Sequence, residues 1–163
     1  MARDAQRAKV YAAEDFVRTM FDRAAARGNR AVDFFGTEVT LPPEGRFGSV
    51  ESVQRYVDDV LALPGVLRAW PAAGAVTVRP RRGMTAAHYE IVGGGPTIAV
   101  PARGSGWALR ELVVLHELAH HLAPVDPAHG AEFVTAMCEL ASIVMGVEVG
   151  YVLRVVYAQE GVR

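Results

Sequence analysis

The stretch Val113–Phe133, VVLHELAHHLAPVDPAHGAEF, holds four of the five histidines in a chain of 163 residues. Its first half is apolar nearly all round, which is typical of a helix buried inside a domain. Its second half contains two prolines and a glycine, which favour a turn before the chain continues. Because histidine is a common metal ligand, this concentration points to metal chemistry.

Two histidines in this stretch have the spacing of a shared ligand site. His116 and His120 are four residues apart, so on a helix they lie on one face and one turn from each other. Both imidazoles can then reach a single ion. Glu117 lies beside that face, where a carboxylate can accept a proton from a water that the metal activates. Glu117 is therefore the predicted general base.

His129 is the predicted third ligand, because catalytic zinc uses three protein ligands and keeps one position open. It follows His120 by nine residues, beyond a turn that can fold the chain back. Asp126 and Pro127 are the predicted N-cap and first position of the next helix, which places His129 in the opening turn of that helix. Gly130 would remove a side chain where this turn crowds the site.

Other side chains near the motif remain alternatives. Glu132 and Glu139 lie on the next predicted helix, where either carboxylate could serve as the third ligand. His121 points about 100° away from the preceding histidine, so we expect it to have a structural or supporting role. Asp126 could accept the outer N–H of a ligand histidine, although helix capping also explains it. His88, on a predicted strand, is expected to be a core or surface residue.

The motif H-E-L-A-H at His116–His120, followed by H-G-A-E-F at His129–Phe133, resembles the zincin superfamily and, around the motif, SprT-like metallopeptidases. Over nearly its whole length, the chain also looks like a family of small actinobacterial metallohydrolases. The resemblance implies a zincin-like fold and a metallopeptidase activity. The shorter spacer between the second and third histidines and the missing cysteine ribbon depart from the SprT-like pattern, so the DNA-linked substrate class of those enzymes is not carried over.

The resemblance also implies that a strand before the active-site helix forms the lip of the cleft. Thr97–Pro101 fits that place, and a free edge there could pair with an extended peptide. An ordinary core strand explains the same pattern, with its proline marking an edge. A peptide or protein substrate is therefore expected, and the substrate's identity stays open.

The first 65 residues predict two helices joined by a mostly irregular segment. Ala5–Ala26 is alanine-rich and has apolar residues at helical spacing, with Glu14 and Arg18 expected to pair on its outer face. The following residues are predicted to be loop, apart from a short strand around Val39. Ser49 is the predicted N-cap of a second helix that ends before the next proline-glycine pair.

The middle of the chain predicts a small antiparallel sheet made of Ala75–Arg79, Ala86–Val92 and Thr97–Ala102. After a Gly-Ser-Gly break at residues 104–106, a buried central helix is expected from Trp107 to about Ala123. A further amphipathic helix follows, and a last helix is expected from Glu148 to about Gln159. The predicted fold is thus α+β, a zincin-like single domain over residues 1–163 with the sheet packed on helices.

Composition narrows the classes of function. With 51% hydrophobic residues the chain can build one substantial core, and its net charge of −1 gives no overall attraction to nucleic acid or membranes. A cluster of Arg79, Arg81 and Arg82 is the one local feature that could favour nucleic acid, and a solvated rim explains it equally well. A single cysteine, Cys138, and a charged N-terminus without an apolar run predict a cytoplasmic protein.

Together these observations predict a hydrolase that uses one Zn2+ ion held by His116, His120 and His129. The expected reaction is hydrolysis of a peptide or amide bond, with Glu117 as general base. The alternative is a zinc-binding protein without catalytic turnover, acting as a binding or regulatory module. Nothing in the sequence predicts the oligomeric state.

Overall fold

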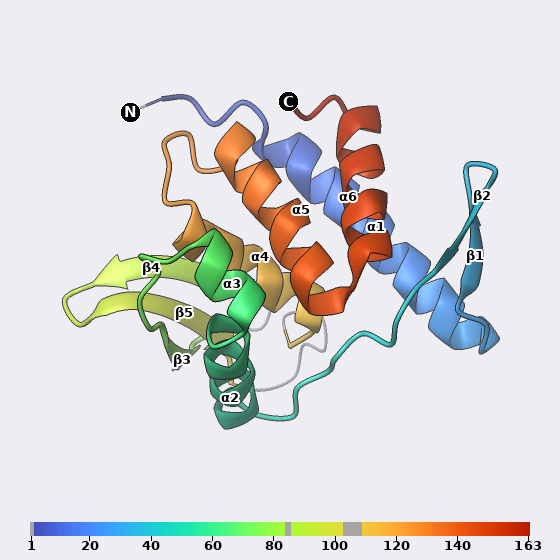
Figure 1. The fold of residues 1–163 in the computed structure, drawn as a ribbon. Helices are drawn as coiled ribbons and strands as arrows, with labels where there is room; N and C mark the ends of the chain where they lie inside the picture. Colours follow the sequence, from blue (N-terminus) through green and yellow to red (C-terminus); the bar gives the residue numbers. More distant parts are fainter. Residues whose placement is uncertain (1, 84–85, 103–108) are drawn as a thin grey trace. The chain divides into compact units, whose positions relative to one another are not determined.

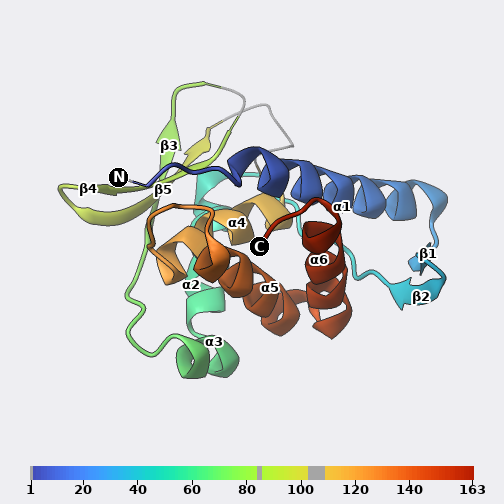
Figure 2. The same cartoon turned by 90° about the horizontal axis from the view of Figure 1, so that it is seen from above.

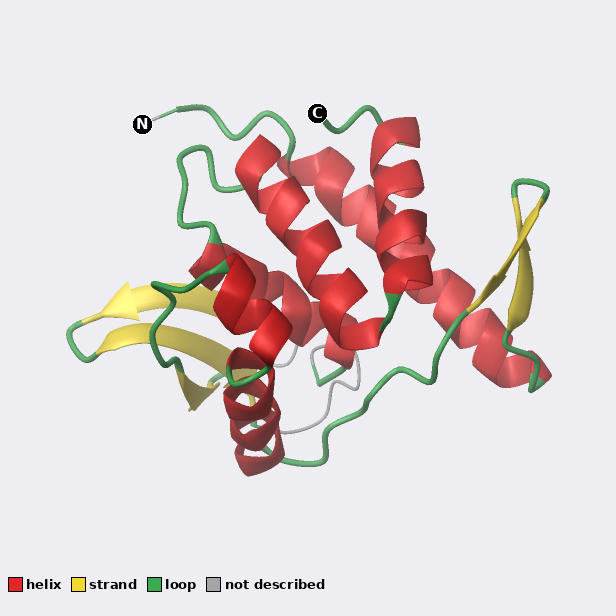
Figure 3. Cartoon of the chain, viewed as in Figure 1, coloured by secondary structure: helices red, strands yellow, loops and turns green. Residues whose placement is uncertain are grey.

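The structure, a computed structural model, describes residues 2–83, 86–102 and 109–163. Along the chain, helices and strands follow in the order α1, β1, β2, α2, α3, β3, β4, β5, α4, α5 and α6 (Figure 1). The structure contains helices together with small antiparallel and mixed sheets (Figure 3), which confirms the predicted α+β class. No helix among the described residues combines the length and the apolar character that crossing a membrane requires.

The chain divides into two compact units, one made of Met1–Pro43 with Pro124–Arg163 and the other of Glu44–Ala123. The expectation of one domain over the whole chain therefore stays a prediction. The Gly-Ser-Gly break and the start of the central helix at Trp107, both expected from the sequence, lie outside the described residues.

The first unit is mainly helical. Its long helix α1 (Arg7–Arg27) packs against α6 (Val147–Gln159), which in turn packs against α5 (Ala131–Met145) (Figure 1). Strands β1 (Ala31–Phe34) and β2 (Thr37–Thr40) form an antiparallel hairpin after α1 (Figure 2). The sequence predicted the three helices and the strand around Val39, but it missed β1.

Helix α1 ends as its sequence predicts, because Gly28 takes a left-handed conformation with φ of 66° that favours glycine. The expected position of Glu14 and Arg18 on the outer face of α1 is wrong. Both side chains are buried, since they follow Val10 and precede Phe21 on the same helical stripe. The Glu14 carboxylate accepts a hydrogen bond of 3.0 Å from the Tyr157 hydroxyl, so it ties α1 to α6.

Helices α5 and α6 approach closely at Gly150. A Cβ atom at this position would lie 1.7 Å from Ser142 Oγ and 2.9 Å from the carbonyl oxygen of Cys138. Only a glycine fits there without displacing α5. This contact places α6 over the helix that follows the histidine-rich stretch.

The second unit contains three helices and a three-stranded sheet among its described residues. Ser49 caps α2 (Val50–Leu61) as predicted, and it forms a capping box with Ser52. Helix α2 ends before Pro64-Gly65, as predicted. The same pair begins a short helix that the sequence analysis missed, α3 (Pro64–Ala69), because proline is well suited to a first helical position. Helix α4 (Glu111–Leu122) is the buried central helix that the sequence predicted.

The sheet is mixed rather than antiparallel. Its strands are β3 (Thr77–Arg81), β4 (His88–Val92) and β5 (Gly95–Pro101), in the order β3-β5-β4 (Figure 2). The predicted hairpin of β4 and β5 is present, but β3 pairs in parallel with the other side of β5. The free edge expected at Thr97–Pro101 is therefore wrong, because β5 is the central strand.

A buried carboxylate from a distant loop fixes the start of α4. Arg110, at the N-cap position, offers no side-chain cap of its own. Instead, Glu44 Oε2 accepts a hydrogen bond of 3.0 Å from the backbone N–H of Leu112. The same carboxylate binds the Arg110 guanidinium through contacts of 2.9 and 2.5 Å, and both side chains are about 5% exposed or less.

Glu111 completes this anchor from the helix side. Its carboxylate accepts hydrogen bonds from the backbone N–H of Gly45, at 2.9 Å, and from the Tyr56 hydroxyl, at 2.5 Å. Burial, followed by the nearby charge of Glu111, raises the pKa of Tyr56, so its hydroxyl remains a donor. The first turn of α4 is thus tied to two other segments of the second unit.

We predict that Glu44→Ala lowers the free energy of unfolding by about 3–5 kcal/mol, because it leaves the Arg110 charge buried without its carboxylate. Arg46→Ala is the matched control, since Arg46 contacts the same carboxylate at 3.7 Å but is half exposed. Its loss should cost less than about 1 kcal/mol. Denaturant-induced unfolding measures both values, and equal effects would contradict this role for Glu44.

Candidate metal centre

Helix α4 brings the two histidines of the motif together. His116 and His120 lie one turn apart, and their Nε2 atoms are separated by 3.1 Å. Zinc–nitrogen bonds of 2.0–2.1 Å in a tetrahedral site place two ligand nitrogens about 3.3 Å apart. The pair therefore has the spacing that two ligands of one ion require. His116 is buried and His120 is partly exposed.

His129 lies in the loop before α5 rather than in the first turn of that helix, so the predicted position is wrong. Helix α5 begins at Ala131 with Gly130 as its N-cap. Asp126 is therefore not the cap, and its carboxylate instead accepts a hydrogen bond of 3.0 Å from the backbone N–H of Ala2. The prediction about Gly130 has support, since a Cβ there would lie 3.1 Å from the carbonyl oxygen of Pro127.

The three histidines form one group that could hold a metal ion. The ligand nitrogens of His116, His120 and His129 all lie within 4.8 Å of one another. Three imidazoles are a donor set that suits zinc and other divalent transition metals, and they leave a fourth position open. The residues present thus fit a single ion, as the sequence predicts, and the identity of the ion stays a prediction.

A carboxylate that the sequence analysis missed holds the third histidine. Asp4 Oδ2 lies 2.7 Å from His129 Nδ1. A carboxylate that is ionised only accepts hydrogen bonds, so Nδ1 carries the proton and Nε2 is the nitrogen suited to a metal. Such carboxylate–histidine pairs orient metal ligands in many sites. The partner expected for this role was Asp126, and no sequence signal links residues 125 positions apart.

The adjacent histidine, His121, points elsewhere, as its position on the helix predicts. Its Nε2 lies 2.8 Å from the carbonyl oxygen of Gly74, and its Nδ1 lies 3.1 Å from the Tyr89 hydroxyl. The carbonyl requires an N–H at Nε2, so Nδ1 accepts from Tyr89. His121 thus connects α4 to β4 and to the loop before β3, which is a structural role.

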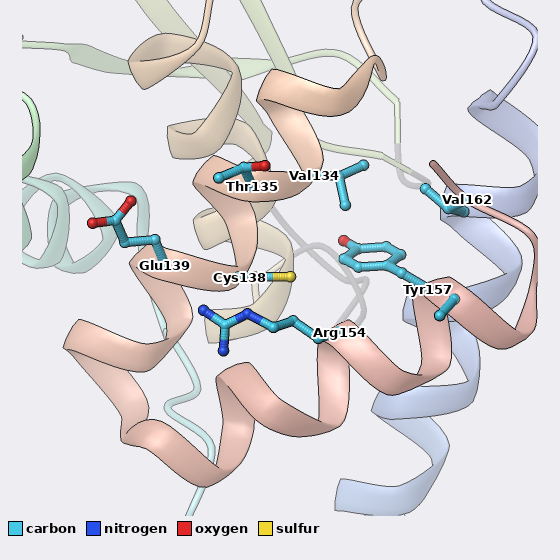
Figure 4. A pocket seen from close by; sticks show the side chains of 8 residues that line it. Val134, Thr135, Cys138, Glu139, Arg154, Tyr157 and Val162 are labelled. Carbon is cyan, nitrogen blue, oxygen red and sulfur yellow. The ribbon is translucent and has the colours of Figure 1, made fainter.

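The alternative ligands lie outside the histidine group. Glu132 is exposed on the first turn of α5, and His88 is exposed on β4. Glu139 is exposed on α5, where it lines a pocket between α5 and α6 together with Cys138 and Arg154 (Figure 4). Their positions favour His129 as the third ligand.

Glu117 is buried on α4 directly after His116, with 7% of its surface exposed. A buried carboxylate beside a group of imidazoles is the arrangement that proton transfer at a metal site requires. Its role as the base stays a prediction.

Several residues that could stabilise a developing negative charge have other partners. The Tyr157 hydroxyl donates to Glu14, and burial followed by that charge raises its pKa well above the ordinary value. Arg110 binds Glu44, and Tyr89 binds His121. Tyr151 and Arg154 lie on α6, where both are exposed.

Cys138 is not part of the group. It is buried on α5, and burial raises the pKa of its thiol to about 11, with Arg154 opposing that effect only in part. A thiol must lose its proton to bind a metal. At neutral pH, Cys138 is therefore a packing residue.

Comparison with known proteins adds no family to these observations. The chain matches no protein-family model, no curated protein and no solved structure. The candidate centre therefore rests on the geometry of the chain's own residues.

We predict that the purified protein binds about one zinc ion per chain, and that His116→Ala or His129→Ala removes most of it, because each supplies one of only three ligands. His121→Ala is the matched control, since this histidine is bound to Gly74 and Tyr89. Metal analysis after dialysis measures the ratios. Full zinc retention in His129→Ala would contradict the assignment of the third ligand.

We also predict that Cys138 reacts slowly with iodoacetamide at pH 8 in the folded protein, because its raised pKa keeps the thiol protonated and its side chain is buried. Its reaction should speed up as the pH approaches about 11. In denaturant, the reaction should be rapid at any pH above the ordinary pKa of a cysteine thiol. Mass spectrometry follows the alkylation. Rapid labelling of the folded protein at pH 8 would show an accessible thiolate.

Proposed function

We propose that the protein is a zinc-dependent hydrolase that cleaves a peptide or amide bond. The observation that carries the proposal is the convergence of three histidine nitrogens within 4.8 Å of one another, two of them from a helix that also carries a buried glutamate. In such a site zinc supplies a Lewis acid that polarises a carbonyl group and lowers the pKa of water to about 7.

The chain's own residues divide the remaining work. His116, His120 and His129 would hold the ion and leave one position for water or substrate. Glu117 would accept the proton of the attacking water and return it to the leaving amine. Asp4 would keep the proton on His129 Nδ1, which leaves Nε2 for the ion.

A peptide substrate has support from the sheet of the second unit. Among the described residues, β4 pairs only with β5, so its other edge can accept an extended chain by strand addition. This strand contacts α4, which carries two of the histidines. Ile91 and Val92 on β4 are exposed apolar residues that could contact a substrate side chain.

The alternative is a zinc protein without turnover. Three ligands rather than four favour the hydrolase, because structural zinc sites use four protein ligands. The buried Glu117 favours it too, since a purely structural triad needs no carboxylate there. Tight zinc binding without activity against a broad peptide library would favour the alternative.

We predict that Glu117→Gln keeps zinc and lowers kcat/KM at least about 100-fold, because proton transfer by such a group contributes about 10²–10⁴ to the rate. Glu132→Gln, an exposed neutralisation on α5, is the matched control. A library of fluorogenic peptides and amides, assayed with zinc-loaded protein, measures the effect. Unchanged activity in Glu117→Gln would remove this mechanism.

A further inference from the structure

We propose that Ala2–Lys9 and Gly161–Arg163 form a clamp on the loop that carries His129, and that Asp4 and Gln6 are the positioning residues through which this clamp sets metal affinity. The inference rests on the proposed metal-dependent function. It assigns a role at the metal site to residues that lie far from the histidine motif in sequence. All of these residues belong to the first unit of the structure.

Asp4 acts on the ligand ring. Its carboxylate oxygen lies 2.7 Å from His129 Nδ1, and the histidine side chain is only 6% exposed. A half-turn of the imidazole about its Cβ–Cγ bond would replace the Nδ1–H donor with the Cδ2–H group, which cannot donate a comparable hydrogen bond to the carboxylate. The contact therefore selects one tautomer and one orientation of the ligand.

Aromatic neighbours restrict the same ring. The centroid of the Tyr11 ring, on α1, lies 5.4 Å from that of His129, and the Phe133 ring on α5 lies 5.0 Å away. Their planes are inclined at 58° and 74° to the imidazole. Packing thus holds the ring from two helices, while Asp4 selects its orientation.

Gln6 acts on the backbone. Its side-chain N–H group donates to the carbonyl oxygen of His129 at 3.0 Å and to that of Arg163 at 2.8 Å. Its side-chain oxygen accepts from the backbone N–H of Arg163 at 2.5 Å. One amide therefore joins the ligand residue to the C-terminal segment, and all of its bonds depend on the position of α1.

Two further contacts secure the clamp at its ends. The backbone N–H of Ala2 donates to Asp126 Oδ2 at 3.0 Å, three residues before His129. Lys9 Nζ lies 3.5 Å from the carbonyl oxygen of Gly161. The loop is thus held at Asp126 and at His129 itself by residues from the beginning of the described chain.

The physical consequence is coupling between metal binding and docking of the clamp. A ligand on an unrestrained loop must be ordered when the ion binds, and each ordered residue costs conformational entropy. The docked clamp has already ordered His129. Because such coupling is reciprocal, bound metal must stabilise the docked clamp by the same factor by which the clamp raises metal affinity.

The test measures zinc affinity of the full chain by competition with a chromogenic chelator. Asp4→Ala should raise the zinc Kd about 10–100-fold, the usual loss when the partner of a ligand histidine is removed. Asp4→Asn should recover part of the affinity, because it keeps an acceptor oxygen. Gln6→Ala should weaken binding in the same direction. Asp15→Ala, an exposed carboxylate on α1 that is 73% exposed and bound to Arg18, should leave the Kd unchanged.

A second measurement separates positioning from folding. Hydrogen exchange in peptides covering residues 2–9 and 160–163 should slow when zinc is added to the wild-type protein, and it should slow less in Asp4→Ala. Thermal unfolding of the zinc-free variants reports any loss of fold. A merely structural role would lower the Tm without changing the zinc Kd of the folded protein.

The outcomes distinguish this inference from the proposed function. A wild-type protein that binds no zinc would overturn both. Zinc binding by Asp4→Ala with the wild-type Kd, or exchange at residues 2–9 that zinc does not change, would overturn the clamp and leave the proposed function intact. Weaker binding in both Asp4→Ala and Gln6→Ala, together with zinc-dependent protection of the clamp, is the result we expect.

Discussion

The Glu44 carboxylate at the first turn of α4 is the interaction that fixes this helix within the second unit. This helix is buried on nearly every side and still carries two histidines and a glutamate. A buried helix end must satisfy its N–H groups, and Glu44 does so from 68 residues away while neutralising Arg110. Because its first turn is fixed in this way, α4 carries His116 and His120 at a defined position within the second unit.

Three buried carboxylates among the described residues follow the same rule. Glu44 meets Arg110 and a backbone N–H, Glu111 meets Tyr56, and Glu14 meets Tyr157. Each carboxylate accepts hydrogen bonds from donors on other elements, so each one fixes the position of a helix or loop. Polar groups therefore specify the arrangement within each unit, while the apolar residues supply most of the stabilisation.

The parts of the site that could be predicted are those encoded over short distances. The spacing of His116 and His120 fixes their relation on any helix, and the glycine after His129 signals the turn. Asp4 could not be predicted, because its contact with His129 depends on how two remote segments meet. The start of α5 was misplaced since Asp-Pro resembles a helix beginning, whereas the turn continues to Gly130.

The difference between short-range and long-range information also explains where the predicted fold was wrong. The hairpin of β4 and β5 follows from its glycine-rich turn, but the side of β5 that receives β3 depends on tertiary packing. Glu14 and Arg18 have the spacing of a surface pair, and only the burial of the stripe from Val10 to Phe21 shows that it faces inward. Local sequence patterns predicted the helices and strands, whereas long-range contacts determine which of them pack or pair with one another.

The side chain of Gln54 covers the outer edge of β3. Its amide donates to the carbonyl oxygen of Val76 and accepts from the N–H of Val78, so it imitates one more strand beside β3. Two positions further on, Pro80 removes a backbone donor from the same edge. Unsatisfied strand edges invite pairing between molecules and lead to aggregation. Gln54 and Pro80 thus end the sheet at β3, which protects the protein against intermolecular growth from this side.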